Sequence, residues 1–177
     1  EGADLSLGFA VNGVLPDASN PFLKGGLQPG MTLVLTKPLG TGVILAAHMR
    51  SDAKGTWVAR ATESMCISNG PAVPVLRKYE VASCTDVTGF GLAGHLSEML
   101  RDGTVRVRVR LSDLPALPGA LECLQKGVRS SLNAANERHA NRMARSDPAV
   151  AAHPRYPLLF DPQTSGGLLA AVPAHHA

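Results

Sequence analysis

The sequence has few aromatic residues, few cysteines and no long apolar run, and each shortage excludes a class of protein. Aromatic residues make up 4% of the 177, and the basic residues form no long block despite a net charge of +3, so stacking on nucleic acid is not supported. Cys66, Cys84 and Cys123 are odd in number, widely spaced and without a Cys-x-x-Cys pair, which favours reduced thiols over a disulfide framework or a zinc site. No apolar run approaches the roughly 20 residues of a membrane span. We therefore expect a cytoplasmic protein that binds neither nucleic acid nor membrane.

The length fits one domain with a sizeable core. The chain begins with Glu1 rather than Met, so we expect it to be a piece of a longer protein.

Alternating strand and helix patterns predict an α/β or α+β sandwich. Strands are predicted at 5–14, 31–36, 79–84, 105–110, 157–160 and 168–172, and helices at 43–50, 57–68, 92–100, 115–127 and 130–145. In 105–110 valine alternates strictly with arginine, which predicts valines on a core face and arginines on a solvated face. An arginine ladder that binds anions is the alternative. The polar residues of the last predicted helix, Asn133, Asn136, His139 and Asn141, are interpreted as surface residues without a role.

The most informative stretch is Thr85-Asp86-Val87-Thr88-Gly89-Phe90-Gly91-Leu92, where a strand pattern ends in a carboxylate and a glycine-spaced turn before a helix. Free N–H groups at a helix start, and backbone left bare by glycine, can approach phosphate oxygens closely. Asp86 would repel a phosphate unless a cation such as Mg²⁺ lies between them.

Two other interpretations of this turn remain open. Gly89, Gly91 and Gly94 satisfy the dinucleotide-binding fingerprint, with Asp113 near the position of its ribose-binding acid. Against it, Asp86 would crowd a pyrophosphate, and the arginine-rich strand is not the apolar run of a buried parallel strand. The glycines can also serve only close packing.

Two basic residues near these motifs are given no role. His95 lies on the helix after the turn and could act as an acid or base, but a buried, hydrogen-bonded histidine is the more frequent case. Lys37 precedes the glycines of 37–42, whereas a phosphate loop has its lysine after them. A plain turn with a helix cap is therefore favoured there over an anion contact.

With these motifs in view, the chain resembles the selenophosphate synthetase (selenide, water dikinase) family of the aminoimidazole ribonucleotide synthetase-like superfamily. The resemblance covers nearly the whole chain. It rests on Gly8-Phe9-Ala10-Val11-Asn12-Gly13, Lys24-Gly25-Gly26-Leu27-x-Pro29-Gly30, Leu35-Thr36-Lys37-Pro38-Leu39-Gly40-Thr41-Gly42, Thr85 to Leu92 as quoted above, and Asp161-Pro162-Gln163-Thr164-Ser165-Gly166-Gly167-Leu168-Leu169.

The resemblance implies a two-domain, homodimeric enzyme that uses ATP and Mg²⁺ to phosphorylate selenide, giving selenophosphate, AMP and phosphate. This chain resembles its C-terminal domain, with 1–20 as the connection to the N-terminal domain and the first strand. The family's nucleophilic Cys or selenocysteine and its nucleotide loop belong to the N-terminal domain. We therefore expect no catalytic residue here and an inactive fragment.

The resemblance also implies a fold and a site. The fold is α+β, a three-layer α/β/α sandwich with a mixed sheet and partial ferredoxin-like topology, as in the C-terminal domain of aminoimidazole ribonucleotide synthetase. Asp86 matches the family's metal-binding aspartate, and the candidates for contact with phosphate are Thr85, Thr88, Gly89 and Gly91. No role is implied for His95, Lys37 or the loop 161–167. The alternative to an enzyme domain is a non-catalytic scaffold domain.

Overall fold

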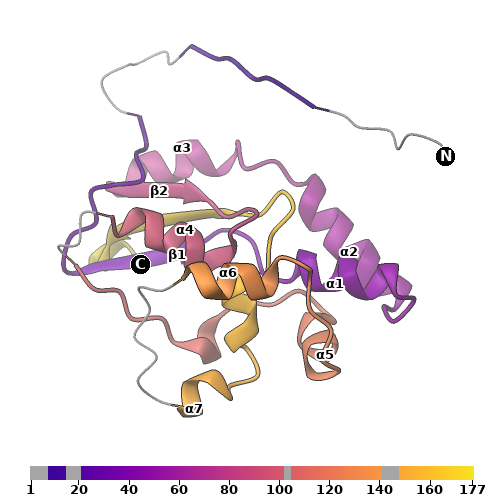
Figure 1. The fold of residues 1–177 in the computed structure, drawn as a ribbon. Coiled ribbons are helices and arrows are strands. Elements are labelled where there is room, and N and C mark those ends of the chain that lie inside the picture. The colour runs from indigo at the N-terminus through magenta and orange to yellow at the C-terminus, as the bar shows by residue number, and fades with distance from the viewer. Residues whose placement is uncertain (1–7, 15–20, 102–104, 141–147) are drawn as a thin grey trace.

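The computed structural model describes residues 8–14, 21–101, 105–140 and 148–177 (Figure 1). The helices are α1 (Thr41–Met49), α2 (Gly55–Cys66), α3 (Ala72–Leu76), α4 (Gly91–Met99), α5 (Ala120–Gln125), α6 (Asn133–His139) and α7 (Pro148–Ala151). The strands are β1 (Met31–Leu35), β2 (Ser83–Asp86) and β3 (Leu168–Pro173). Short 3₁₀ helices are η1 (Arg77–Tyr79), η2 (Leu111–Asp113), η3 (Tyr156–Phe160) and η4 (Ala174–His176).

The strands form one antiparallel sheet in the order β1-β3-β2. Met31 pairs with Pro173 at one end of the β1–β3 ladder, and Asp86 pairs with Leu168 at the end of the β2–β3 ladder. Asp86 therefore lies beside the first residue of β3, and Pro173, the last residue of β3, lies at the opposite end of the sheet, because antiparallel partners run in opposite directions.

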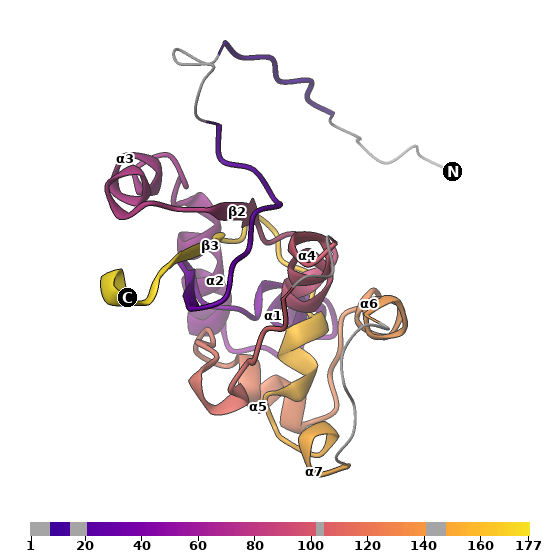
Figure 2. The ribbon, with the colours of Figure 1, turned by 90° about the vertical axis from the view of Figure 1, so that its left-hand side faces the viewer.

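The sheet lies between two helical layers, because successive strand residues point to opposite faces. Leu169 and Ala171 of β3 belong to the main core, which contains apolar residues of α1, α4, α5 and η3. Ala170 faces the other way and packs with Cys84 and with Leu76 of α3. Figure 2 shows α3 on the opposite side of the sheet from α4. The expected α+β, three-layer arrangement is confirmed.

Three predicted strands are wrong over the described residues. Residues 157–160 lie in η3, because a short buried apolar run has no periodicity that separates strand from helix. Residues 105–110 keep the expected alternation, valines half-buried and arginines exposed, but have no strand assignment. Residues 8–14 carry no strand and leave Phe9 and Val11 exposed, while 5–7 lie outside the described part.

Other boundaries shift by a few residues. β2 begins at Ser83 rather than 79, because Tyr79 closes η1 and Glu80 adopts a left-handed conformation that turns the chain. The helix expected at 115–127 is only α5, since Gly119 has a positive φ, and α6 is the described part of the helix expected at 130–145. The sheet itself is antiparallel. The mixed sheet that the resemblance implies is therefore not found among the described residues, where parallel pairing is limited to an isolated bridge between Leu39 and Ala116.

Within the described ranges, no helix combines the length and the apolar character that crossing a membrane requires.

Candidate functional site

Three loops that are far apart in the sequence meet at one end of the sheet. They are 36–42, 85–91 and 161–167. The N–H of Val87 donates to Gly167 O over 2.9 Å, and the N–H of Gln163 donates to Thr88 O over 3.0 Å. The hydroxyl of Thr36 accepts from Leu168 N at 2.8 Å. Three of the five motifs therefore form one junction rather than separate sites.

Gln163 links two of these loops through its buried side chain. Its Oε1 accepts from Gly40 N at 3.0 Å and from Thr41 N at 3.3 Å. Its Nε2 donates to the carbonyl of Asp161 at 2.8 Å and to Asp161 Oδ2 at 3.0 Å. The first N–H groups of α1 are thus occupied from within the protein. This supports the plain-turn interpretation of 37–42 over an anion contact.

Asp161 lies fully buried against the start of α1. Burial raises the pKa of Asp161 from 3.8 to about 7, because a charged carboxylate loses its water there. The N–H groups of Val43 and Gly42, the Gln163 side chain and the charge of Arg129 oppose this rise. The sequence assigns no role to the loop 161–167. In the structure this loop binds both of the other loops, 36–42 and 85–91, and so holds the junction together.

Close packing accounts for several of the motif glycines. Gly91 has a φ of +68°, and a Cβ placed on it would lie 2.9 Å from Leu159 O. A Cβ on Gly167 would lie 2.5 Å from Lys37 N. Gly89 differs, because a Cβ placed there meets no atom within 4 Å. Packing therefore requires Gly91 and Gly167, but does not require Gly89.

Asp86 is the last residue of β2 and is exposed. Its backbone is fixed by the ladder with Leu168 and by the Val87–Gly167 hydrogen bond that follows. Its carboxylate forms no hydrogen bond or ion pair with any residue that the structure describes. Carboxylate oxygen is the donor that Mg²⁺ prefers, so the residue present at this position fits a hard cation.

The four candidates for contact with phosphate differ in access. Gly89 is exposed and Thr88 is half-buried, whereas Thr85 and Gly91 are buried. The Thr85 hydroxyl donates to Asp86 O over 3.1 Å, and Gly91 N donates to Thr88 O over 3.0 Å. An open cavity of about 370 Å³ borders Gly89.

His95 and Lys37 are both buried and engaged within the protein. His95 Nε2 lies 3.2 Å from the Thr88 hydroxyl, and its Nδ1 lies 3.4 Å from Glu98. Lys24 binds Glu98 over 2.7 Å and holds the pKa of Glu98 below its usual range. Lys37 Nζ donates to two backbone carbonyls, and burial lowers its pKa. His95 is thus the buried, hydrogen-bonded histidine that the sequence favours.

Two asparagines of α6 were wrongly placed on the surface. Asn136 and Asn133 are buried. Asn136 Nδ2 donates to Gly89 O over 2.8 Å and to Phe160 O over 3.0 Å, and so holds the glycine turn from outside. No local pattern signals this role, because it depends on a contact 47 residues away in sequence. The His139 side chain and Asn141 lie outside what the structure describes.

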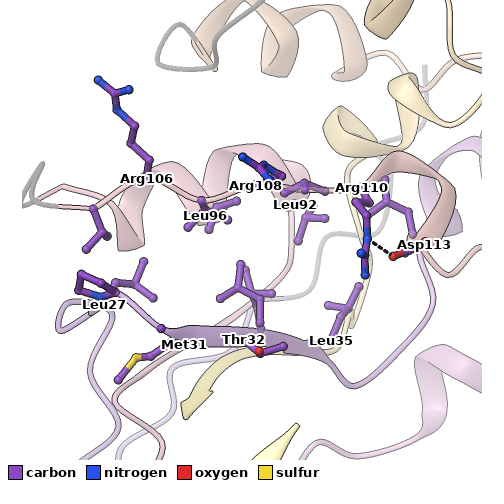
Figure 3. A pocket seen from close by; sticks show the side chains of 18 of the residues that line it. Leu27, Met31, Thr32, Leu35, Leu92, Leu96, Arg106, Arg108, Arg110 and Asp113 are labelled. Atoms are coloured by element: carbon purple, nitrogen blue, oxygen red, sulfur yellow. Dashed lines mark hydrogen bonds and ion pairs between the residues drawn. The ribbon is translucent and has the colours of Figure 1, made fainter. Parts of the chain in front are cut away.

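A second cavity, of about 800 Å³, lies elsewhere, between β1 and residues 105–110 (Figure 3). Arg106 is exposed and points away from it, and Arg110 binds Asp113 over 2.6 Å at its edge. An ion-paired Asp113 and an antiparallel sheet do not support the dinucleotide alternative, which requires parallel strands. The arginines form a solvated face rather than a converging ladder.

All three cysteines are free thiols, as expected. Cys66 is exposed, while burial raises the pKa of Cys84 and of Cys123.

Comparison with known proteins gives a consistent result. Residues 28–177 match the model of the family described as AIR synthase related protein, C-terminal domain. The chain is 39% identical over 178 residues to a protein of Pelobacter propionicus named selenide, water dikinase, covering 100% of this chain and 50% of that protein. Proteins of the same name from Porphyromonas gingivalis and Escherichia coli are 36% and 40% identical, over 96% and 93% of this chain and 48% and 46% of theirs. The chain spans about half the length of the curated relatives it matches.

Proposed function

The chain belongs to the AIR synthase related protein family, as its C-terminal domain, and on this premise we propose that it is the C-terminal domain of a selenide, water dikinase. The whole enzyme would convert ATP, selenide and water into selenophosphate, AMP and phosphate in the cytoplasm. An N-terminal domain would bind most of the ATP and supply the nucleophilic Cys or selenocysteine, and the enzyme would be a homodimer. The likeness to relatives of that name over nearly all of this chain supports the proposal.

The position of Asp86 is the single observation that supports a role for this domain in metal binding. An exposed carboxylate with no partner in the described structure is held by rigid backbone where three loops meet. We propose that it is a Mg²⁺ ligand. Bound Mg²⁺ would neutralise the charge that develops on phosphate oxygens during phosphoryl transfer. One carboxylate is too few for a cation site, so the other ligands would come from ATP and from the N-terminal domain.

The turn after Asp86 would orient the phosphates. Gly89 is exposed beside an open cavity, so its backbone can be approached without a Cβ in the way. The Thr88 hydroxyl is held near His95 Nε2, which limits its rotation. Thr85 and Gly91 are buried, so they would not contact phosphate themselves and would instead hold the turn in its conformation.

The test uses the full-length enzyme that contains this domain. Asp86→Asn keeps the shape and removes the charge, so we expect most of the activity to be lost, about tenfold or more, with a raised Mg²⁺ requirement and unchanged unfolding temperature. Asp113→Asn is the matched control and should be nearly silent, because Asp113 is exposed, is bound to Arg110 and belongs to none of the three loops that meet at Asp86.

Full activity of Asp86→Asn at unchanged Mg²⁺ dependence would refute the metal role and favour a scaffold domain. The isolated chain should unfold cooperatively on heating but form no AMP from ATP and selenide. Selenide-dependent AMP formation by this chain alone would contradict the assignment of the nucleophile to another domain.

A further inference from the structure

A second group of metal-binding side chains lies at the other end of the sheet from Asp86. Glu80, His175 and His176 each offer a ligand atom, and these atoms all lie within 4.8 Å of one another. Glu80 closes η1 just before β2, and the two histidines belong to η4 just after β3. None of the three belongs to the motifs of the proposed function.

The antiparallel ladder explains how residues almost 100 positions apart meet. It places the start of β2 beside the end of β3, with Ala82 N donating to Ala171 O over 3.1 Å. Figure 2 shows the C-terminal turn on the side of α3, away from α4 and α6. Glu80 precedes β2 and Asp86 is its last residue, and the extended chain from Ser83 to Asp86 alone spans about 10 Å. The two groups cannot share one cation.

The cluster is held in place by several contacts. Glu80 has φ 50° and ψ 46°, a left-handed conformation that is uncommon for residues other than glycine and fixes the direction of the turn. The rings of Tyr79 and His176 meet edge to face at 5.5 Å, and those of His175 and His176 lie 4.1 Å apart. Ala174 N donates to Gly30 O over 3.2 Å, which anchors η4 to the start of β1.

The donor atoms select the type of cation. Two imidazole nitrogens and one carboxylate oxygen suit Zn²⁺, which accepts three protein ligands of this kind and leaves a fourth position to water. Mg²⁺ prefers an all-oxygen octahedron and gives up water reluctantly. Among divalent ions this set therefore favours Zn²⁺ strongly over the Mg²⁺ assigned to Asp86.

We propose that Glu80, His175 and His176 form a Zn²⁺ site that ties the end of β3 to the turn before β2. All three side chains are exposed, so water competes for the ion and binding is weaker than at a buried structural site. Binding stabilises the folded chain, because the ligands come together only when the β2–β3 ladder is formed.

The test is calorimetric titration of the 177-residue chain, free of any polyhistidine tag, with Zn²⁺. We expect one ion per chain, a higher unfolding temperature with Zn²⁺, and no displacement by excess Mg²⁺. Glu80→Gln, His175→Asn and His176→Asn should each lower the affinity about tenfold or more, since loss of a ligand costs at least as much as loss of its supporting contacts. Circular dichroism of each variant confirms that it is folded.

Matched controls distinguish this site from adventitious Zn²⁺ binding by other exposed side chains. His48→Asn and Glu63→Gln change exposed residues outside the cluster, and Asp86→Asn removes the other proposed ligand; all three should bind Zn²⁺ as tightly as the unchanged chain. Absence of Zn²⁺ binding, unchanged affinity in Glu80→Gln, or loss of binding in His48→Asn would each overturn the proposal. Because these outcomes are read from Zn²⁺ binding alone, they are independent of the Asp86 assignment.

Discussion

Replacement of Asp161 by asparagine should change how the stability of the chain depends on pH. Asp161 is fully buried at the start of α1, and burial raises its pKa from 3.8 to about 7. In the unfolded chain the carboxyl titrates near its ordinary value of about 3.9. The folded protein therefore holds a proton at this position through a pH range in which the unfolded chain has released it.

The sign and size of the effect follow from this difference. Below about pH 4 both states are protonated and the full stability is present; as the pH rises towards 7 only the folded state keeps the proton, so stability falls. Above pH 7 the loss is complete and constant. A tenfold change in proton affinity is worth about 1.4 kcal/mol, so a pKa of about 7 in place of 3.8 corresponds to about 4 kcal/mol. That is a large part of a typical unfolding free energy of about 5–15 kcal/mol.

Urea unfolding at pH 4.5, 6 and 8 measures the effect in the unchanged chain and in Asp161→Asn. The asparagine places its amide NH2 opposite another donor, either Nε2 of Gln163 or the N–H groups of Gly42 and Val43, which costs a similar amount at every pH. The stability of the original chain relative to the variant should therefore decrease by up to about 4 kcal/mol as the pH rises through the window. Parallel pH curves for the two proteins would refute a raised pKa.

Asp113→Asn is the control of opposite sign. Hydrogen bonds from Ser112 and Arg110 lower the pKa of this exposed carboxyl. Its stabilising contribution is present above its unfolded pKa and is lost only as the pH falls through the lower folded value. Between pH 5 and pH 8 its curve should run parallel to that of the unchanged chain.

Two further predictions separate packing from access. Gly91→Ala should destabilise the chain by about 2–4 kcal/mol in urea unfolding, through the left-handed backbone and the clash with the 159–161 carbonyls, while Gly89→Ala should change stability by less than about 0.5 kcal/mol; equal effects would contradict the distinction. At neutral pH a thiol reagent should label Cys66 quickly and Cys84 and Cys123 only on unfolding. Rapid labelling of more than one thiol per chain would show that the core is open.

The elements that the sequence predicts well are those whose pattern is long enough to define a period. The helical spacing after Gly91 predicts α4, and the apolar run from Leu168 predicts β3. The alternation in 105–110 predicts which side chains are buried. It does not predict a ladder partner, because strand pairing is decided by distant parts of the chain. The five apolar or aromatic positions of η3 carry no usable period at all.

The candidate site shows the same division. Asp86 can be proposed as a site residue from its motif, because the carboxylate after a strand and before a glycine turn is a local pattern. The roles of Gln163, Asp161 and Asn136 cannot be predicted from the sequence, since each depends on a partner more than 40 positions away. Polar residues in a glycine-rich loop are equally compatible with a solvated turn until the loop that they bind is known.

Some glycines of these motifs allow close packing and Gly89 leaves the backbone accessible, and together they leave Asp86 exposed at the junction of the loops. Gly91 and Gly167 let backbone segments approach more closely than a Cβ would allow, and the hydrogen bonds of Gln163 then fasten the loops together. This packing leaves Asp86 and Gly89 exposed on a segment whose backbone is hydrogen-bonded to β3 and to the loop 161–167. A carboxylate on ordered backbone loses less conformational entropy on binding a cation than one on a mobile loop. In the full-length enzyme, substitutions at Gly91 and Gly167 should therefore weaken Mg²⁺ binding because they destabilise the fold. Asp86→Asn should weaken Mg²⁺ binding without changing stability. Measuring Mg²⁺ affinity and unfolding temperature for each variant distinguishes the two causes.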